Sequence, residues 1–311
     1  MTHIPLISFD EMDKHLSWKA MAEAIRAGHD LPKAQLQDVF IRRDSDTLLN
    51  RSAWVDGLGV AVKAATVFPK SDPSVDGGML VFDDDSGALQ AVVDFKLVTK
   101  WKTVADSMLG ASLLARPKSK RLLVVGAGTV AENLISAYQS FFDLDHISVW
   151  SRTEKSAQKL AAKTNTTPIT DLESAAIDAD IISCATMATE PVVSGDWLQA
   201  GQHIDLIGAY RGDMREVDDA ALTRARIFVD SRDTTIDHIG ELKIPISQGV
   251  ITANDIIADY YDIPMGKFAR NSDDEITLFK NGGGAHMDLM IAKAIIALWQ
   301  NINAAGQIHQ E

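Results

Sequence analysis

The chain has 311 residues, of which 46% are hydrophobic and 23% are charged. These fractions are ordinary for a soluble globular protein, and the length suffices for two domains that each bury a core. The 30 basic and 43 acidic residues give a net charge of −13, without any block rich in Lys or Arg. Nucleic acid is therefore not expected as a partner.

Targeting and redox signals indicate a cytoplasmic protein without membrane contact. No apolar run reaches the roughly 20 residues that span a bilayer, and residues 1–5 lack the charged start and apolar run of a signal peptide. The single cysteine, Cys184, permits no internal disulfide and is interpreted as a packed thiol at a strand end. The eight histidines show no paired ligand spacing, so no metal site is predicted.

The region up to about Pro117 has an α+β pattern. Asp83 to Gly87 give a hairpin turn signal between two β-type runs. The expected elements are a helix over 18–28, strands over 58–67, 79–82 and 89–93, and a helix from Thr99 or Thr103 to Ala115. The polar, proline-containing segment 116–120 is expected to be a domain boundary.

Residues 121–131 carry the strongest motif of the chain. The apolar run Leu122 to Val125 passes into G-x-G-x-x-A, and a helical pattern follows over 129–141. This order is typical of a dinucleotide-binding unit, in which Gly126 permits the turn and Gly128 lets a pyrophosphate approach the helix N-terminus. Thr129 and Val130 begin that helix and belong to the predicted cofactor site.

The next β-type run, 146–150, ends at Ser151, Arg152 and Thr153. An acidic residue at this strand end usually binds a free ribose 2′-hydroxyl, whereas Arg and hydroxyl groups suit a 2′-phosphate. The segment therefore predicts NADP(H) in preference to NAD(H). The alternative is an arginine that lies at the surface without contacting the cofactor.

Further apolar runs occur at the spacing of a parallel sheet, over 180–185, 203–207 and 225–230. Ligands bind at the carboxyl ends of such strands, which places Thr186, Met187, Ala188 and Gly208 at the site. A β-type run over 276–280 leads into Gly282 to Gly284, interpreted as a ligand-facing turn, a hinge, or both. An apolar helix over 287–304 ends the pattern. We expect a Rossmann domain over 118–275 and a second domain built from 1–117 and 276–311.

Basic residues in apolar or strand-like settings are candidates to bind a substrate carboxylate. Lys63 lies inside a strand pattern, Lys102 lies at the expected start of a helix, and Arg42 and Arg43 follow an apolar strand. A lysine at a helix N-terminus is unfavourable unless an anion lies nearby. For each residue, a solvated surface position is the alternative.

Taken together, the chain resembles the ornithine cyclodeaminase/mu-crystallin family over nearly its whole length. The motifs are an Arg before Leu48-Leu49-Asn50-Arg51-Ser52-Ala53-Trp54, then Lys63, the 83–87 hairpin, Lys102-Thr103, Val125-Gly126-Ala127-Gly128, Trp150-Ser151-Arg152-Thr153, Ala188-Thr189-Glu190-Pro191 and Phe279-Lys280-Asn281-Gly282-Gly283-Gly284. Their order and spacing, more than any one of them, carry the resemblance.

The resemblance implies an α/β protein with a Rossmann domain, an N-terminal substrate-binding and dimerisation domain, and a homodimer. It places Arg42, Lys63 and Lys102, with Thr103, around the substrate carboxylate, and Arg43 is the alternative to Arg42. The implied cofactor residues are Gly126, Gly128, Thr129, Val130, Ser151, Arg152, Thr153, Thr186, Met187, Ala188, Gly208, Lys280 and Gly282.

Departures from the family pattern select the activity. Cyclodeaminases of the family carry an acidic residue where this chain has Tyr210, and a tyrosine hydroxyl is protonated at neutral pH. Lys102-Thr103 is similar to the branch that reduces Δ1-pyrroline-2-carboxylate to L-proline, with Δ1-piperideine-2-carboxylate as a further substrate. Asn50-Arg51-Ser52 departs from the more frequent Leu-Met-Pro of relatives. The alternatives are an ornithine cyclodeaminase, an alanine-type dehydrogenase, and a mu-crystallin-like protein that binds NADPH and a small ligand.

Overall fold

The computed structural model describes residues 4–308. Of the segment 1–5, which was interpreted as lacking a signal peptide, positions 1–3 lie outside the described residues. The chain forms two compact units, Met1–Lys102 with Gly284–Glu311, and Thr103–Gly283. None of the described helices is both long enough and apolar enough to cross a membrane.

The first unit contains a six-stranded sheet in the order β1-β6-β5-β4-β3-β2. Its strands are β1 (Leu6–Ile7), β2 (Gln35–Arg43), β3 (Asp46–Val55), β4 (Gly59–Val67), β5 (Val75–Phe82) and β6 (Leu89–Asp94). All neighbouring strands pair antiparallel except β1 and β6, which pair parallel. The helices are α1 (Phe9–Met12), the 3-10 turn η1 (Asp13–His15), α2 (Trp18–Gly28), the start of α3 (Phe95–Leu114), and α10 (Ala285–Ile308).

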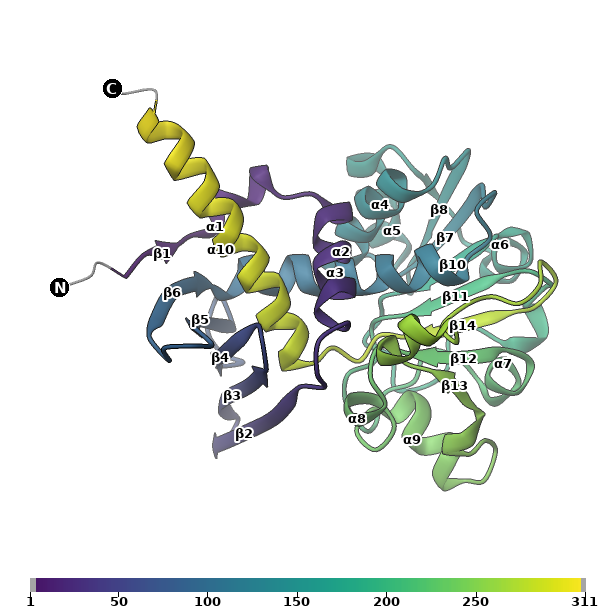
Figure 1. Ribbon diagram of the computed structural model, residues 1–311. Coiled ribbons are helices and arrows are strands. Elements are labelled where there is room, and N and C mark those ends of the chain that lie inside the picture. Colours follow the sequence, from purple (N-terminus) through teal and green to yellow (C-terminus); the bar gives the residue numbers. More distant parts are fainter. Residues whose placement is uncertain (1–3, 309–311) are drawn as a thin grey trace. The chain divides into compact units, whose positions relative to one another are not determined.

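The two faces of this sheet differ in burial. Helix α10 packs across β2 to β5 and against α2, as Figure 1 shows for the long yellow helix. The strand β4 alternates accordingly, with Ala61, Lys63 and Ala65 buried on the α10 side. The other face carries exposed apolar side chains from three strands, namely Val39, Ile41, Trp54 and Leu80.

Helix α3 begins earlier than its sequence predicts. It starts at Phe95, because the Oδ1 atom of Asp94 accepts hydrogen bonds from the backbone N–H groups of Lys96 (2.6 Å) and Leu97 (3.3 Å). An aspartate at this position is a typical helix N-cap. Lys102 therefore lies two turns inside the helix, and the expectation that it opens the helix and needs an anion there is wrong.

The second unit is a doubly wound sheet of eight parallel strands in the order β13-β12-β14-β11-β10-β7-β8-β9. Its strands are β7 (Arg121–Val125), β8 (His146–Trp150), β9 (Thr167–Pro168), β10 (Ile181–Cys184), β11 (His203–Leu206), β12 (Arg226–Val229), β13 (Ile256–Ala258) and β14 (Thr277–Lys280). The α-helices are α4 (Thr129–Phe141), α5 (Glu154–Thr164), α6 (Leu172–Asp178), α7 (Asp219–Arg224), α8 (Arg232–Thr235) and α9 (Gly240–Ser247). The 3-10 turns are η2 (Gly195–Trp197), η3 (Ala253–Asp255) and η4 (Tyr260–Met265).

This sheet confirms the predicted α/β class and the strands expected from Leu122 onward. The chain winds outward from β7 through β8 to β9 and then returns to β10 on the other side of β7. The topological switch point therefore lies between β7 and β10, which is where such folds bind ligands. Cys184 is fully buried at the end of β10, as expected for a packed thiol, and its burial raises the pKa well above the usual thiol range.

The unit boundaries differ from the expected 117/118 and 275/276. Strand β14 pairs with both β11 and β12 in the middle of the large sheet, so residues up to Gly283 belong to the second unit. The second half of α3 also belongs there, because Gly110 approaches the ring of Phe279 so closely that a Cβ would lie 2.7 Å from it. The proline-containing segment 116–120 is a connection inside this unit.

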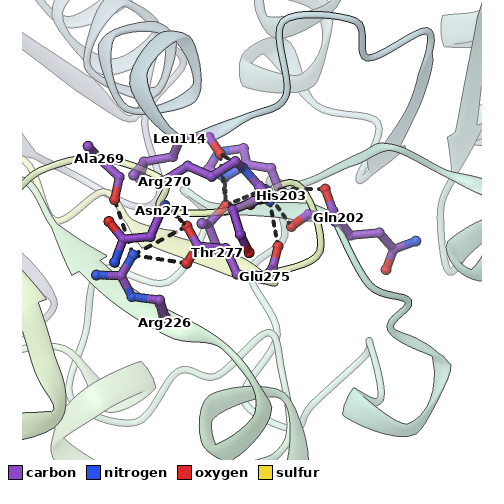
Figure 2. A network of polar contacts seen from close by, with 11 residues as sticks. Leu114, Gln202, His203, Arg226, Ala269, Arg270, Asn271, Glu275 and Thr277 are labelled. Atoms are coloured by element: carbon purple, nitrogen blue, oxygen red, sulfur yellow. Dashed lines mark hydrogen bonds and ion pairs between the residues drawn. The ribbon is translucent and has the colours of Figure 1, made fainter.

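A polar network closes the amino-terminal edge of the large sheet (Figure 2). Arg270 donates to the carbonyl oxygens of Leu114 (2.7 Å) and Gln202 (3.1 Å) and to the hydroxyl of Thr277 (3.1 Å). His203 contacts the same hydroxyl at 2.9 Å, and burial, followed by the Arg270 charge, lowers the pKa of His203 to about 3. The network joins α3 to the starts of β11 and β14. It therefore lies at the opposite end of the sheet from the carboxyl ends of the strands, where such folds bind ligands.

Candidate active site

The turn between β7 and α4 has the geometry of a phosphate-binding loop. Gly126 has a φ of +129°, and a Cβ there would lie 2.5 Å from the carbonyl oxygen of Ala185 at the end of β10. Gly128 is the N-cap of α4, makes no side-chain cap, and would have no atom within 4 Å of an added Cβ. The uncapped N–H groups and the helix dipole favour an anion in this open space. The loop therefore fits the pyrophosphate of a dinucleotide.

The end of β8 presents the residues expected at the adenosine ribose. Arg152 and Thr153 are exposed, and Ser151 is half-buried. Thr153 is the N-cap of α5 without a side-chain cap, so its hydroxyl is not used to hold the helix. An exposed guanidinium beside two hydroxyl groups has the chemistry that binds a 2′-phosphate.

The carboxyl ends of β10 and β11 are held together by one buried carboxylate. The Oε1 atom of Glu216 accepts hydrogen bonds from the N–H (2.7 Å) and hydroxyl (2.8 Å) of Thr186, and Oε2 accepts from the N–H of Gly208 (2.8 Å) and Ala209 (3.3 Å). A Cβ at Gly208 would lie 2.1 Å from the Thr186 carbonyl oxygen. Thr186 and Gly208 were predicted from the sequence, whereas Glu216, which sets their positions, was not.

Glu216 is itself surrounded by buried charges. Glu241 on α9 accepts from the backbone N–H groups of Glu216 (2.8 Å) and Val217 (3.1 Å). Burial and then the charge of Glu241 raise the pKa of Glu216 to about 7, although Lys280 and the hydrogen bonds from Thr186 act in the opposite direction. The protonation state of the Glu216 carboxyl group therefore changes near neutral pH.

Two predicted cofactor contacts have internal partners. Lys280 is fully buried, and its Nζ donates to the carbonyl oxygens of Leu206 (2.8 Å) and Asn281 (2.7 Å). The N–H of Gly282 donates to Asp230 Oδ2 at 2.8 Å, as does that of Gly283 at 2.6 Å. These groups shape the turn after β14 with donors that are satisfied within the unit, and their contact with the cofactor stays a prediction.

Four further predicted cofactor residues lie at the start of α4 and after β10, namely Thr129, Val130, Met187 and Ala188. Thr129 and Val130 form the first turn of α4, and Val130 is exposed. Met187, 66% exposed, and the half-buried Ala188 follow β10, and the N–H of Ala188 donates to the hydroxyl of Thr186 (3.3 Å). Tyr210 is exposed in the loop after β11 and lies beside Arg211.

The first unit contains a buried ion pair between β4 and α10. Lys63 on β4 donates to Asp288 Oδ1 on α10 at 2.9 Å, and the Lys63 ammonium lies 4.8 Å from the centre of the Phe95 ring. Burial lowers the pKa of Lys63, and the attraction of Asp288 only partly opposes this effect. The pKa of Asp288 is lowered, because the charges of Lys63, Lys102 and Arg51 outweigh its burial.

Arg51, which was not predicted as a site residue, lies beside Lys63, whereas the carboxylate-binding role of Arg42 stays a prediction. In the β3/β4 register Arg51 lies directly opposite Lys63, and its Nε donates to Asp38 at 2.9 Å. Arg42 lies four positions along β2 from Asp38, which is ~13 Å at the usual rise of a strand. Arg42 and Arg43 are both exposed near the hairpin end, and Arg43 donates to Asp46 (2.8 Å).

The cations Lys63, Arg51 and Lys102, whose charges act on Asp288, form a group that we call the basic cluster, and His286 lies beside it. Lys102 on α3 is buried, and its charge acts on both Lys63 and Asp288. His286 in the first turn of α10 is 1% exposed, and its ring meets that of His29 edge to face at 5.2 Å. Burial and the charges of His29, Lys102 and Arg51 lower the pKa of His286 well below its usual value. Thr103 follows Lys102 and is half-buried, with its carbonyl accepting from Asn281 (2.9 Å).

Among residues 4–308, no group of three or more His, Cys, Asp or Glu side chains has the arrangement of a metal site. The two units instead present a basic cluster around one buried carboxylate, and a dinucleotide-type loop at a switch point. The first is suited to a small carboxylate-bearing molecule, and the second to a nucleotide cofactor.

The chain is similar to one protein family over most of its length. The model of the ornithine cyclodeaminase/mu-crystallin family matches residues 59–303. The chain belongs to this family. A Delta(1)-pyrroline-2-carboxylate reductase of Paracoccus denitrificans is 51% identical over 300 residues, which cover 93% of this chain and 95% of that protein.

Solved structures of family proteins share the fold over nearly the whole chain. The Delta(1)-pyrroline-2-carboxylate reductase of Thermococcus litoralis, in complex with NADH and L-proline, matches with a TM-score of 0.85 and 27% identity, covering 94% of this chain and 97% of that one. An archaeal alanine dehydrogenase dimer with bound NAD matches with a TM-score of 0.87 and 27% identity, covering 96% of this chain and 97% of that one. The family resemblance seen in the sequence is thereby confirmed.

Proposed function

We propose that this protein is an NAD(P)H-dependent reductase that converts the cyclic ketimine Δ1-pyrroline-2-carboxylate to L-proline. The observation that carries the proposal is the buried Lys63–Asp288 ion pair with Arg51 and Lys102 around it, because a cluster of cations with one carboxylate matches a small zwitterionic acid. The names of the Paracoccus and Thermococcus relatives support the same substrate. Δ1-Piperideine-2-carboxylate, with one more ring carbon, is proposed as a further substrate.

Arg51 and Lys102 are the proposed carboxylate ligands, and Lys63 is the proposed proton source. The reduced nicotinamide supplies a hydride to C2 of the ring when it is bound, and the electron pair of the C=N bond moves to the ring nitrogen. Hydride addition to the protonated ring imine gives the neutral secondary amine, which then gains one further proton to become the ammonium of L-proline. An ammonium whose pKa is lowered by burial gives up its proton more readily than a solvated lysine, which suits Lys63 to this step.

For the cofactor we propose NADP(H) in preference to NAD(H). The proposed contacts are the β7–α4 turn with Gly126, Gly128, Thr129 and Val130 for the phosphates, and Ser151, Arg152 and Thr153 for the 2′-phosphate. Thr186, Met187, Ala188 and Gly208 then lie at the strand ends toward the nicotinamide. The support is the uncapped α4 N-terminus and the exposed Arg152 with no acidic residue at the end of β8.

We further propose that the protein is a cytoplasmic homodimer, and that the first unit binds substrate and partner while the second binds the cofactor. The proposed interface is the sheet face of Val39, Ile41, Trp54 and Leu80, which are 38 to 59% exposed. An apolar sheet face of this kind is typically covered by a partner. The archaeal alanine dehydrogenase, a dimer of the same fold, supports a second copy of this chain as that partner.

The deciding experiment follows NADPH oxidation when the purified protein meets Δ1-pyrroline-2-carboxylate. Ornithine with NAD, assayed for ammonia, and pyruvate with ammonia and NADH test the cyclodeaminase and alanine dehydrogenase alternatives. Oxidation with the ketimine and neither other activity supports the proposal. Ammonia release from ornithine overturns it, and tight binding of NADPH without turnover favours a mu-crystallin-like binding protein.

A further inference from the structure

One oxygen of the buried Asp288 carboxylate accepts no hydrogen bond from the described residues. Asp288 is fully buried in the first turn of α10, and its Oδ1 accepts from Lys63 at 2.9 Å. Its Oδ2 is enclosed and has no hydrogen-bond partner among the described residues. A buried carboxylate oxygen without a donor costs free energy, and such a group in a native protein points to a missing ligand or water.

The cations around Asp288 account for its negative charge, but none of them donates a hydrogen bond to its Oδ2 atom. Burial raises the pKa of Asp288, but the charges of Lys63 on β4, Lys102 on α3 and Arg51 on β3 together lower it below its usual value, so the carboxylate is ionised. A single ion pair with Lys63 uses one of its two oxygens. A stabilising role alone would favour donors to both oxygens, so Oδ2 is left as an acceptor for one further cationic donor.

The substrate and product of the proposed reaction supply such a donor. The protonated ring nitrogen of Δ1-pyrroline-2-carboxylate and the ammonium of L-proline each carry a positive charge and an N–H, two bonds away from the carboxylate carbon. A site with cations alone would bind the carboxylate and repel the nitrogen. We infer that Asp288 Oδ2 binds the cationic ring nitrogen, which makes Asp288 a catalytic residue of this site.

This inference rests on the proposed function and adds a specific role to it. By holding the imine in its protonated form, Asp288 increases the positive charge at C2, the atom that accepts the hydride. Lys63 lies at the other oxygen of the same carboxylate, next to the nitrogen, which becomes a neutral amine on hydride transfer and then takes up a proton. Asp288 thereby places the proton source, the ring nitrogen and the negative charge that stabilises it in one short array.

The test compares two ligands that differ only at the ring nitrogen. L-Proline has an ammonium and a carboxylate, whereas cyclopentanecarboxylate has the carboxylate alone. Binding of each, with NADP+ present, is measured by calorimetry for the wild type, Asp288→Asn and a control, Asp13→Asn. Asp13 is matched to Asp288 because it also accepts from a lysine of the same unit, Lys100 at 2.7 Å, outside the basic cluster.

In Asp288→Asn we expect the affinity for L-proline to fall by about tenfold or more, the loss typical of a charge-assisted hydrogen bond. Cyclopentanecarboxylate should bind equally well or more tightly, because a negative charge has been removed. Asp13→Asn should change neither affinity. An equal loss for both ligands would mean that Asp288 only shapes the site, and unchanged proline binding would also overturn the inference.

The pH dependence of turnover gives a second readout. Because Asp288 raises the pKa of Lys63 against its burial, and Lys102 and Arg51 act in the other direction, Asp288→Asn should move the alkaline limb of kcat to lower pH. A fixed limb contradicts the role of Asp288 beside Lys63. If the wild type reduces the ketimine and Asp288→Asn has the same L-proline affinity and pH dependence of kcat, only this inference fails. A wild type that neither reduces the ketimine nor binds L-proline overturns the proposed function as well.

Discussion

Arg51 on β3 lies directly opposite Lys63 on β4, on the face of the sheet that α10 covers. Like charges in directly opposed cross-strand positions destabilise a sheet. Asp38 and Asp288 provide partial compensation, because each accepts a hydrogen bond from one of the two cations. Together with Lys102, the pair leaves an excess of positive charge, which is the condition for binding an anion.

Arg51→Met should raise the KM for the ketimine about tenfold or more, since a charge-assisted contact to the carboxylate is lost. Arg42→Met should leave KM within about twofold, because Arg42 lies outside the cluster. Initial rates at varied ketimine concentration measure both. The reverse order of effects would restore Arg42 as the carboxylate ligand.

Lys63→Ala should lower kcat about 100-fold or more, the usual range for a lost proton donor, while the Kd for NADPH stays within about twofold. The substitution also leaves the Asp288 carboxylate buried without its cation, so the protein should be destabilised by about 3 kcal/mol. Kinetics, NADPH titration and urea unfolding separate these effects. Equal losses of turnover and NADPH binding would show that Lys63 is structural.

Adding Asp288→Asn to Lys63→Ala provides the control for that prediction. The double variant removes the unpaired charge and should recover part of the lost stability, yet it should stay inactive. A double variant that recovers activity together with stability would argue against a chemical role for Lys63.

Arg152→Ala should weaken NADPH binding about tenfold or more and change NADH binding little, because only NADPH has the 2′-phosphate. Arg211→Ala, an exposed arginine of the same unit paired with Asp213, is the matched control and should affect neither cofactor. Fluorescence titration with both cofactors makes the comparison. An unchanged ratio of the two affinities would contradict the preference for NADP(H).

Glu216 predicts a specific pH dependence of stability. Its pKa in the folded protein is about 7, above the 4.5 of an ordinary glutamate, so between these values the folded state binds more protons than the unfolded state. This group therefore stabilises the fold fully below pH 4.5, and its contribution is lost as the pH rises toward 7, by on the order of 1.4 kcal/mol per pH unit.

Urea unfolding at pH 5 and pH 7.5 tests this dependence. In Glu216→Gln the difference between the two pH values should shrink relative to the wild type, since the amide does not titrate. Glu190→Gln, at an exposed position, should keep the wild-type difference. The same pH difference in the wild type and Glu216→Gln would mean that other groups cause it.

Trp54→Asp should convert the proposed dimer to monomers, because it places a charge in the proposed apolar interface. Met265→Asp, at an apolar residue of the second unit that is 60% exposed, is the control and should remain dimeric. Sedimentation velocity measures both. A dimeric Trp54→Asp would move the interface to another surface.

Local sequence patterns were sufficient to predict the Rossmann unit and most of its strands. The run from Leu122 to Gly128 and the helix from Thr129 have local causes, since β-branched residues, glycine at a positive φ and helical periodicity act within a few residues. For the same reason the 83–87 hairpin was predictable between β5 and β6. Short strands such as β9 and β13 carry too few residues to show a pattern.

The composition of the basic cluster, in contrast, depends on contacts between elements that lie far apart in the sequence. Arg51 meets Lys63 only through the register of β3 and β4, and Asp288 reaches Lys63 from 225 positions away along the chain. The Asp94 cap moved the start of α3 and placed Lys102 two turns inside the helix. Lys280 and Gly282, recognised as a motif, have donors satisfied by internal acceptors. Local patterns specify elements, whereas charge pairing and burial depend on which distant elements the fold brings together.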